Sequence, residues 1–147
     1  MSSAGYFAHV RSIVEFPGDD DAFVRGWNAL SWGKVRDVVD ILPGLKSRAP
    51  VYMSTKSNRT HEIFLRTAYS KTLNLFIDLF VSSRLGQRRP ERSALDAVAA
   101  KTGFGLTSML FYDDTIENVE AARTAGLRAV HVTEPSDVGR ELACKPA

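Results

Sequence analysis

The sequence has little of several features that would decide a protein's class. It contains one cysteine, Cys144, so neither an internal disulfide nor a cysteine-ligated metal cage can form. No apolar run approaches the roughly 18 residues that a membrane helix needs, and the first residues lack the basic and apolar regions of a secretory signal. Lys and Arg number 19 against 17 Asp and Glu, which gives no charge excess to favour nucleic acid. We therefore expect a cytoplasmic protein with neither a membrane nor a nucleic-acid partner.

The remaining composition is that of one soluble globular domain. A chain of 147 residues with 44% hydrophobic residues is long enough to bury roughly two-thirds of the surface of its unfolded form. The low hydrophobicity and high net charge of disordered chains are both missing. Residues 84–92 form the one basic cluster, which we expect to be a solvated face. His9, His61 and His131 are scattered along the chain, so we expect surface or hydrogen-bonded histidines and not a histidine metal site.

The first third of the chain reads as a set of short helices. Apolar residues recur at helical spacing over residues 7–14, 23–30 and 35–42. Pro17-Gly18 separates the first two helices, and Pro43-Gly44 is expected to end the third. Residues 19–21 are three aspartates, which suit the cap and first turn of the second helix.

From residue 50 onward, strands and helices alternate. Strands are predicted at 50–53, 76–81, 108–112 and 128–132, with helices over 60–73, 91–101 and 115–125, the last capped by Thr115. This alternation predicts an α/β fold with a parallel sheet and helices packed on its faces. Ligands of such sheets bind beyond the carboxyl ends of the strands. That rule selects the polar residues at these ends: Ser54, Thr55, Ser82, Ser83, Asp113 and Asp114.

Each of these signals has two interpretations. Asp113 and Asp114 are adjacent carboxylates that suit a hard cation such as Mg²⁺, but they also suit the start of a helix. Arg89, before a proline, could hold an anion such as phosphate or be a surface arginine. Ser54 could donate a hydrogen bond to a phosphoryl oxygen or be a turn residue. The residues alone leave both interpretations open.

In their order along the chain, these motifs resemble those of a known family. Residues 51–132 resemble the haloacid dehalogenase (HAD) superfamily of hydrolases, in its phosphatase-like group with a helical cap. The resemblance rests on Val-Tyr-Met-Ser at 51–54, Gly-Gln-Arg-Arg-Pro at 86–90 and Phe-Tyr-Asp-Asp-Thr-Ile-Glu-Asn-Val at 111–119. Asn58 with His61 is similar to the family's serine loop, and residues 23–45 are similar to its connection between cap and core.

The resemblance implies a fold, a chemistry and a set of site residues. It implies a Rossmann-like three-layer sandwich, with residues 1–45 as part of a cap and residues 46–147 as the α/β core. The implied chemistry is magnesium-dependent hydrolysis of a small phosphorylated metabolite. The roles carried over are phosphate binding by Ser54, Thr55, Arg89 and Asn118, a catalytic part for Ser54 and Arg89, and Mg²⁺ binding by Asp113 and Asp114. Arg89 stands where the family usually has lysine, and a planar guanidinium is not equivalent to an ammonium group.

One family motif is not found. The resemblance implies a nucleophilic aspartate in an Asp-x-Asp motif after an apolar strand, at the centre of the sheet. Before Ser54 the sequence has Asp-x-Asp only at residues 19–21, directly after Pro17-Gly18, which would interrupt a strand. We therefore expect the first central strand and the nucleophile to be missing, as in the downstream part of a longer protein, and this chain alone to be inactive. Residues 6–16 or another chain could supply a substitute strand, and self-association through the incomplete sheet is a further expectation.

Three functions follow from these observations. The first is a HAD-like hydrolase of the phosphatase type, present as an incomplete copy. The second is a non-catalytic binding or regulatory protein of the same fold that retains a pocket for phosphate and magnesium. The third is a helical interaction module in which Phe7, Trp27 and Trp32 form a docking face.

Overall fold

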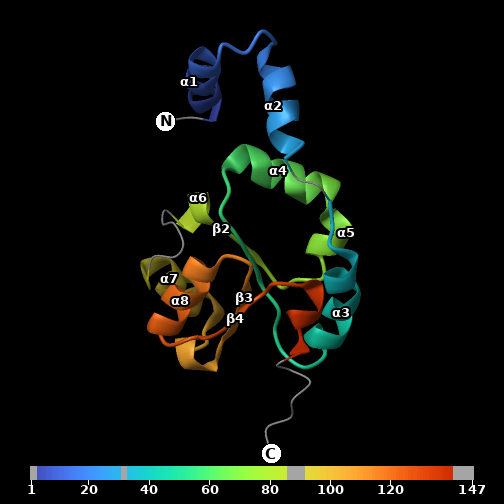
Figure 1. Cartoon of the computed structure of the whole chain (residues 1–147), viewed down its shortest axis with the longest axis vertical. Helices are drawn as coiled ribbons and strands as arrows, with labels where there is room; N and C mark the ends of the chain where they lie inside the picture. Colours follow the sequence, from blue (N-terminus) through green and yellow to red (C-terminus); the bar gives the residue numbers. More distant parts are fainter. Residues whose placement is uncertain (1–2, 31–32, 86–91, 141–147) are drawn as a thin grey trace, which may run out of the picture.

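A computed structural model describes residues 3–30, 33–85 and 92–140 of the chain (Figure 1). Within these ranges no helix combines the length and the apolar character needed to cross a membrane. The elements are α1 (Ser3–Val14), α2 (Asp20–Asn28), α3 (Arg36–Lys46), β1 (Met53–Thr55), α4 (Arg59–Ala68), α5 (Ser70–Leu73), β2 (Leu79–Val81), α6 (Ser82–Leu85), α7 (Arg92–Thr102), η1 (Leu106–Ser108), β3 (Leu110–Asp113), α8 (Ile116–Thr124), β4 (Arg128–His131) and η2 (Pro135–Asp137).

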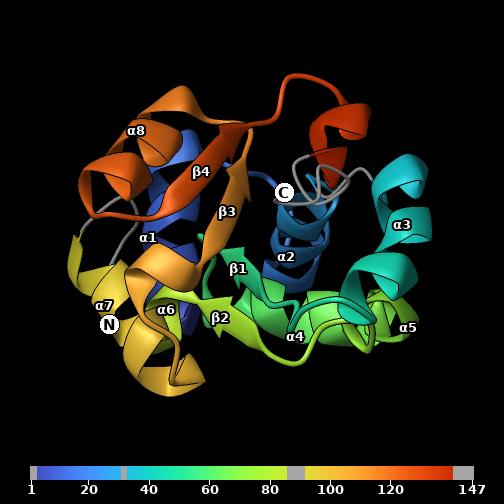
Figure 2. The ribbon, with the colours of Figure 1, turned by 90° about the horizontal axis from the view of Figure 1, so that it is seen from below.

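The four described strands form two parallel pairs. In the first pair, β1 lies beside β2 with Met53 opposite Leu79. In the second, β3 lies beside β4 with Leu110 opposite Arg128. The two pairs are separate two-stranded sheets, and in Figure 2 the strands follow one another in the order β2, β1, β3, β4. The expected α/β architecture with parallel strands is therefore confirmed.

The apolar core lies where α7 and α8 cover the β3–β4 pair. Leu95, Ala122 and Leu127 form a buried cluster, against which Phe111 of β3 packs. Gly126 has φ +98°, a conformation that glycine adopts without steric cost. With Gly126 in this conformation, the backbone N–H of Leu127 donates to the carbonyl of Ala122 at 3.0 Å, which ends α8 and directs the chain into β4.

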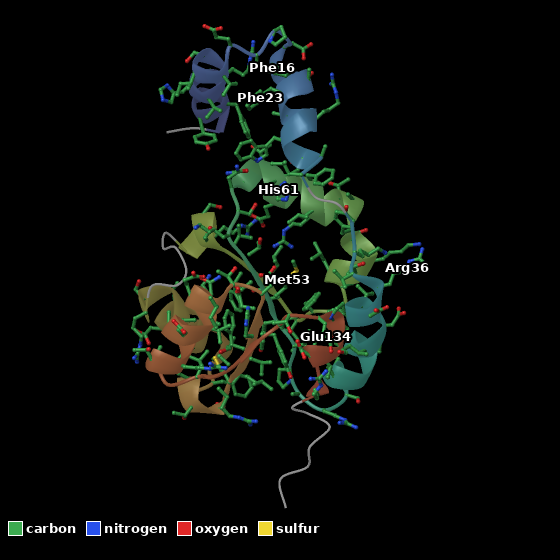
Figure 3. The ribbon with its side chains drawn as sticks, viewed as in Figure 1. Phe16, Phe23, Arg36, Met53, His61 and Glu134 are labelled. Carbon is green, nitrogen blue, oxygen red and sulfur yellow. The ribbon has the colours of Figure 1, made fainter. Side chains whose placement is uncertain are left out.

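Helices α1 and α2 lie side by side at one end of the molecule (Figure 1), and an aromatic cluster joins them. Phe7 is 4% exposed, and its ring lies edge-on to those of Phe23 and Trp27, with centroids 5.8 and 5.6 Å away. Figure 3 shows Phe16 and Phe23 between the two helices, and their centroids are 5.2 Å apart. The buried position of Phe7 is inconsistent with an exposed docking face built on it, and Trp32 lies outside the described residues.

The three aspartates at 19–21 open α2, as the sequence predicts. Asp19 is the N-cap, and its Oδ1 accepts a hydrogen bond from the backbone N–H of Ala22 at 2.7 Å. Asp20, in the first turn, forms an ion pair with Arg11 of α1. These carboxylates therefore serve the ends and the packing of helices and do not follow a strand.

The predicted end of the third helix is wrong. Helix α3 continues through Pro43 and Gly44 to Lys46. Proline lacks an N–H donor, but its carbonyl still accepts, and here it takes a hydrogen bond from the N–H of Ser47 at 3.2 Å. Ile41 and Leu45 of α3 face Gly139, just after η2, so tertiary packing holds the helix beyond the proline.

Two other boundaries differ from the prediction. The helix predicted over 60–73 is divided at Tyr69 into α4 and α5, because Tyr69 has φ −120° and ψ 24°, outside the helical region. Ser82 and Ser83, which follow the predicted strand, begin the short helix α6. Strand β2 itself is limited to Leu79–Val81.

Candidate functional site

The acidic pair lies at the carboxyl end of β3, where the sequence placed it. Asp113 is the last residue of the strand and Asp114 begins the turn into α8. Oδ1 of Asp113 accepts hydrogen bonds from the backbone N–H of Thr115 at 3.0 Å and from Nδ2 of Asn118 at 2.9 Å. Asp113 is half-buried while Asp114 is exposed. Two donors thus hold the Asp113 carboxylate in one orientation at the start of α8.

These contacts show what two neighbouring residues do at the start of α8. Thr115 occupies the N-cap position of α8, but its hydroxyl makes no capping hydrogen bond. The Asp113 carboxylate instead accepts from the N–H of Thr115, and so meets one of the backbone donors at this helix start. Asn118, predicted to bind phosphate, has its amide nitrogen directed at Asp113. In this structure Asn118 orients the carboxylate.

His131, on the neighbouring strand β4, contacts the turn that contains Asp114. It is the last residue of β4 and lies opposite Asp113 in the parallel register. Its Nε2 is 3.2 Å from the backbone carbonyl of Asp114, a hydrogen bond in which the Nε2–H tautomer donates. Sequence reasoning expected a surface or hydrogen-bonded histidine but did not connect it to the acidic pair. His131 lies within the last predicted strand and Asp113 directly follows the one before it, but the register that places them opposite each other is known only from the fold.

The serine predicted to bind phosphate lies within β1. Ser54 is half-buried, in register with Phe80 of β2, and Thr55 is the last residue of the strand. Beyond the strand, Asn58 caps α4, with its Oδ1 accepting from the N–H of His61 at 2.9 Å. Ser54 therefore lies one residue before the carboxyl end of β1, and Asp113 lies at the carboxyl end of β3 in the other pair.

A reciprocal hydrogen bond connects the segment after β1 to the segment after β2. Oγ of Ser82 accepts from the backbone N–H of Ser57 at 3.1 Å and donates to the backbone carbonyl of Ser57 at 3.2 Å. Ser82 is thus the residue by which the start of α6 holds the loop that follows Ser54. Arg89, predicted to contact phosphate, lies outside the described residues.

A buried carboxylate lies behind this loop, and sequence reasoning missed it. Glu62 of α4 is 1% exposed. Its oxygens accept from Nε of Arg66 at 2.8 Å and from Nε of Arg84 at 2.8 Å, and Nη2 of Arg84 is also 2.8 Å from Oε1. The spacing of Glu62 and Arg66 on one helix is visible in the sequence. The partnership with Arg84, 22 residues away, depends on the fold, and Arg84 makes it while its side chain stays largely exposed.

His61 connects the core to the N-terminal helices. Its Nδ1 lies 3.1 Å from Oδ1 of Asn28, the last residue of α2, and Figure 3 shows His61 on α4 below the end of α2. Because the oxygen of Asn28 is the acceptor, Nδ1 carries the proton in this arrangement. Burial lowers the pKa of His61 below its usual value, so the neutral imidazole is favoured.

The donor chemistry at β3 fits a magnesium ion. Mg²⁺ prefers oxygen ligands and is usually held by one or two carboxylates together with phosphate oxygens and water. Asp113 and Asp114 supply two carboxylates at one strand end. Across the described residues, no group of three or more His, Cys, Asp or Glu side chains is placed to hold a metal.

No family model matches this chain, but several curated proteins share sequence with it, including the following two. A phosphatase from Mycobacterium tuberculosis (strain CDC 1551 / Oshkosh) is 41% identical over 58 residues, which are 39% of this chain and 27% of that protein. Drimenol cyclase from Aspergillus calidoustus is 31% identical over 90 residues, which are 61% of this chain and 17% of that protein. The chain thus spans about a quarter or less of the curated relatives that it matches.

Solved structures resemble the fold over nearly the whole chain. A HAD-family enzyme from Bacteroides thetaiotaomicron superposes with a TM-score of 0.80 at 18% identity, covering 99% of this chain and 73% of that one. A second structure of that enzyme, in complex with magnesium and inorganic phosphate, gives a TM-score of 0.75 at 18% identity over 89% of this chain and 69% of that one. At such identities the likeness establishes the fold.

Proposed function

Because this chain has the fold of the HAD superfamily, which confirms the sequence resemblance at the level of the fold, we propose that it binds magnesium and the phosphate group of a small phosphate ester at its strand ends. The observation that carries the proposal is the Asp113 carboxylate, which Asn118 and the N–H of Thr115 orient at the end of β3 beside Asp114. The Bacteroides enzyme of similar fold binds both magnesium and inorganic phosphate.

In this proposal Asp113 and Asp114 hold the cation, and Ser54, Thr55 and Arg89 face the phosphate group. Asn118 contributes by holding Asp113, with which it shares a hydrogen bond. A bound magnesium ion would neutralise charge on the phosphate oxygens. The proposed substrate is a small phosphorylated metabolite.

Calorimetric titration with Mg²⁺ and then inorganic phosphate tests the binding. We expect wild type to bind phosphate only when Mg²⁺ is present, and both Asp113→Asn and Ser54→Ala to weaken that binding. Ser108→Ala, in η1 outside the proposed site, is a matched control with an exposed serine. If wild type binds neither ion, the proposal is wrong.

We also propose that this chain alone does not hydrolyse phosphate esters. Its one Asp-x-Asp upstream of Ser54 is committed to helix α2, where Asp19 caps the N-terminus and Asp20 pairs with Arg11. The expected result is no release of phosphate from p-nitrophenyl phosphate by the pure protein in the presence of Mg²⁺. Turnover that Asp113→Asn abolishes would contradict this and favour an active hydrolase over a binding protein.

The division of the described sheet supports a further part of the proposal. The β1–β2 and β3–β4 pairs are separate, and we place a fifth, central strand between β1 and β3, supplied by another polypeptide segment or by a second copy. Residues 1–45 would contribute part of a cap and residues 46–147 the core. Light scattering over a range of protein concentrations tests self-association. A mass that stays monomeric throughout would show that a second copy does not supply the central strand.

A further inference from the structure

Among the described residues, Glu62 is the charged residue that is buried. Stability alone does not explain why a carboxylate occupies this position. Glu62 is 1% exposed, yet all of its partners are charged. Removing a carboxylate from water is costly, and replacing a buried ion pair with well-packed apolar residues is often neutral or stabilising. The benefit of this ion pair is therefore to be sought in the geometry that it imposes.

The two arginines on Glu62 make different kinds of link. Arg66 lies one turn further along the same helix, so its 2.8 Å contact ties α4 only to itself. Arg84 belongs to α6 and binds both carboxylate oxygens, with Nε 2.8 Å from Oε2 and Nη2 2.8 Å from Oε1. A two-point contact of a planar guanidinium with a carboxylate fixes orientation as well as distance. The Arg84 contact therefore sets how α6 lies against α4.

A second link lies close to the first in the chain. Ser57, just before α4, exchanges two hydrogen bonds with Ser82, the first residue of α6. Helix α4 follows β1, which contains Ser54, and α6 follows β2 directly. The two links together fasten the connections that leave β1 and β2, at the strand ends where the proposed phosphate site lies.

We propose that Glu62 is a positioning residue, which through Arg84 fixes α6 against α4 and thereby sets the geometry of the Ser54 loop for a phosphate group. The inference rests on the proposed function. Glu62 itself is buried behind the loop and does not contact the phosphate.

The test compares Arg84→Met with Arg66→Met, because both remove a guanidinium from the same carboxylate but only the first removes a link between helices. Phosphate affinity is measured by calorimetry with inorganic phosphate at saturating Mg²⁺, with circular dichroism to establish that each variant is folded. We expect Arg84→Met to weaken phosphate binding roughly 10-fold, as supporting residues of ligand sites do. Arg84→Lys should recover part of the loss, and Arg66→Met should bind phosphate as wild type does.

Hydrogen exchange gives a readout that does not require phosphate to bind. The amides of Ser57 and of residues 82–84 should exchange faster in Arg84→Met than in wild type or Arg66→Met, because the cross-link is lost. Equal effects of the two variants on affinity and exchange would overturn the inference and make Glu62 simply a buried charge that needs neutralising. If wild type binds no phosphate but Arg84→Met still shows the faster exchange, the proposed function is refuted while the link between α6 and α4 is confirmed.

Discussion

Replacing Asp113 by Asn or by Ala separates its structural part from its charge. Asp113→Ala removes the acceptor of the two hydrogen bonds from Thr115 and Asn118, each worth about 1.5–3 kcal/mol to an ionised group. The site is half-buried, so water replaces part of this loss. The substitution also removes the repulsion between the Asp113 and Asp114 carboxylates, which offsets the loss by on the order of 1 kcal/mol. We expect a net loss of about 2 kcal/mol of unfolding free energy, or roughly 4–8 °C in Tm for a chain of this size.

Asp113→Asn has a different expected outcome. Its Oδ1 can still accept from both donors, and loss of the charge relieves the repulsion by Asp114, so stability should stay within about 1 kcal/mol of wild type. Magnesium binding should nevertheless be lost in both variants, because a neutral amide is a poor ligand beside a single carboxylate. Urea unfolding and calorimetry measure the two quantities. Equal stability of Asp113→Ala and wild type, or wild-type Mg²⁺ affinity in Asp113→Asn, would refute the reasoning.

Three further predictions concern residues outside the acidic pair. Glu62→Gln should lower the unfolding free energy by about 1–3 kcal/mol, because it removes the charge that both arginines bind while the arginines themselves stay accessible to water. Unchanged stability in urea unfolding would contradict this. Burial lowers the pKa of His61, so protonation of His61 favours the unfolded state. Wild type should therefore lose stability relative to His61→Gln as the pH falls from about 7 to 5, through the usual histidine pKa of about 6.5. Parallel pH profiles of the two proteins would exclude this. The pKa of Asp137 is lowered by hydrogen bonds from the backbone N–H groups of Thr133 and Glu134 and from the Thr133 hydroxyl. The ionised carboxylate therefore stabilises the fold fully above about pH 4, and this contribution is lost as the pH falls further. The stability difference between wild type and Asp137→Asn should shrink below about pH 4, and a difference that stays constant down to about pH 2 would contradict this.

The parts of the fold that the sequence predicts well are those that local patterns determine. Apolar runs located β1, β2, β3 and β4 to within a few residues, and the polar residues after the second and third runs, Ser82 and Asp113, mark the ends of β2 and β3. Features that depend on packing were missed. Helix α3 continues through Pro43 because Ile41 and Leu45 pack near Gly139, almost a hundred residues away in the chain. No local pattern encodes that contact.

The same distinction applies to the candidate site. Asp113 and Asp114 were placed correctly because a strand followed by an acidic pair is a local pattern. The contacts of Glu62 with Arg84 and of His131 with Asp114 join residues 22 and 17 positions apart. Such pairs become visible only when the order and register of the strands are known. The positions of the strand ends were therefore easier to predict than the long-range contacts around them.

Two acidic segments of this chain show how the local structure places one residue type in two different settings. Asp19 follows Pro17-Gly18, so no strand can direct it, and it caps a helix through the N–H of Ala22. Asp113 follows a strand whose partner, β4, fixes its direction, and its carboxylate is further held by Asn118. A carboxylate that only caps a helix needs one backbone donor, whereas one that is to bind a cation must be oriented before the cation arrives. The combination of strand, side-chain donor and neighbouring carboxylate at Asp113 meets that requirement, and the segment at 19–21 does not.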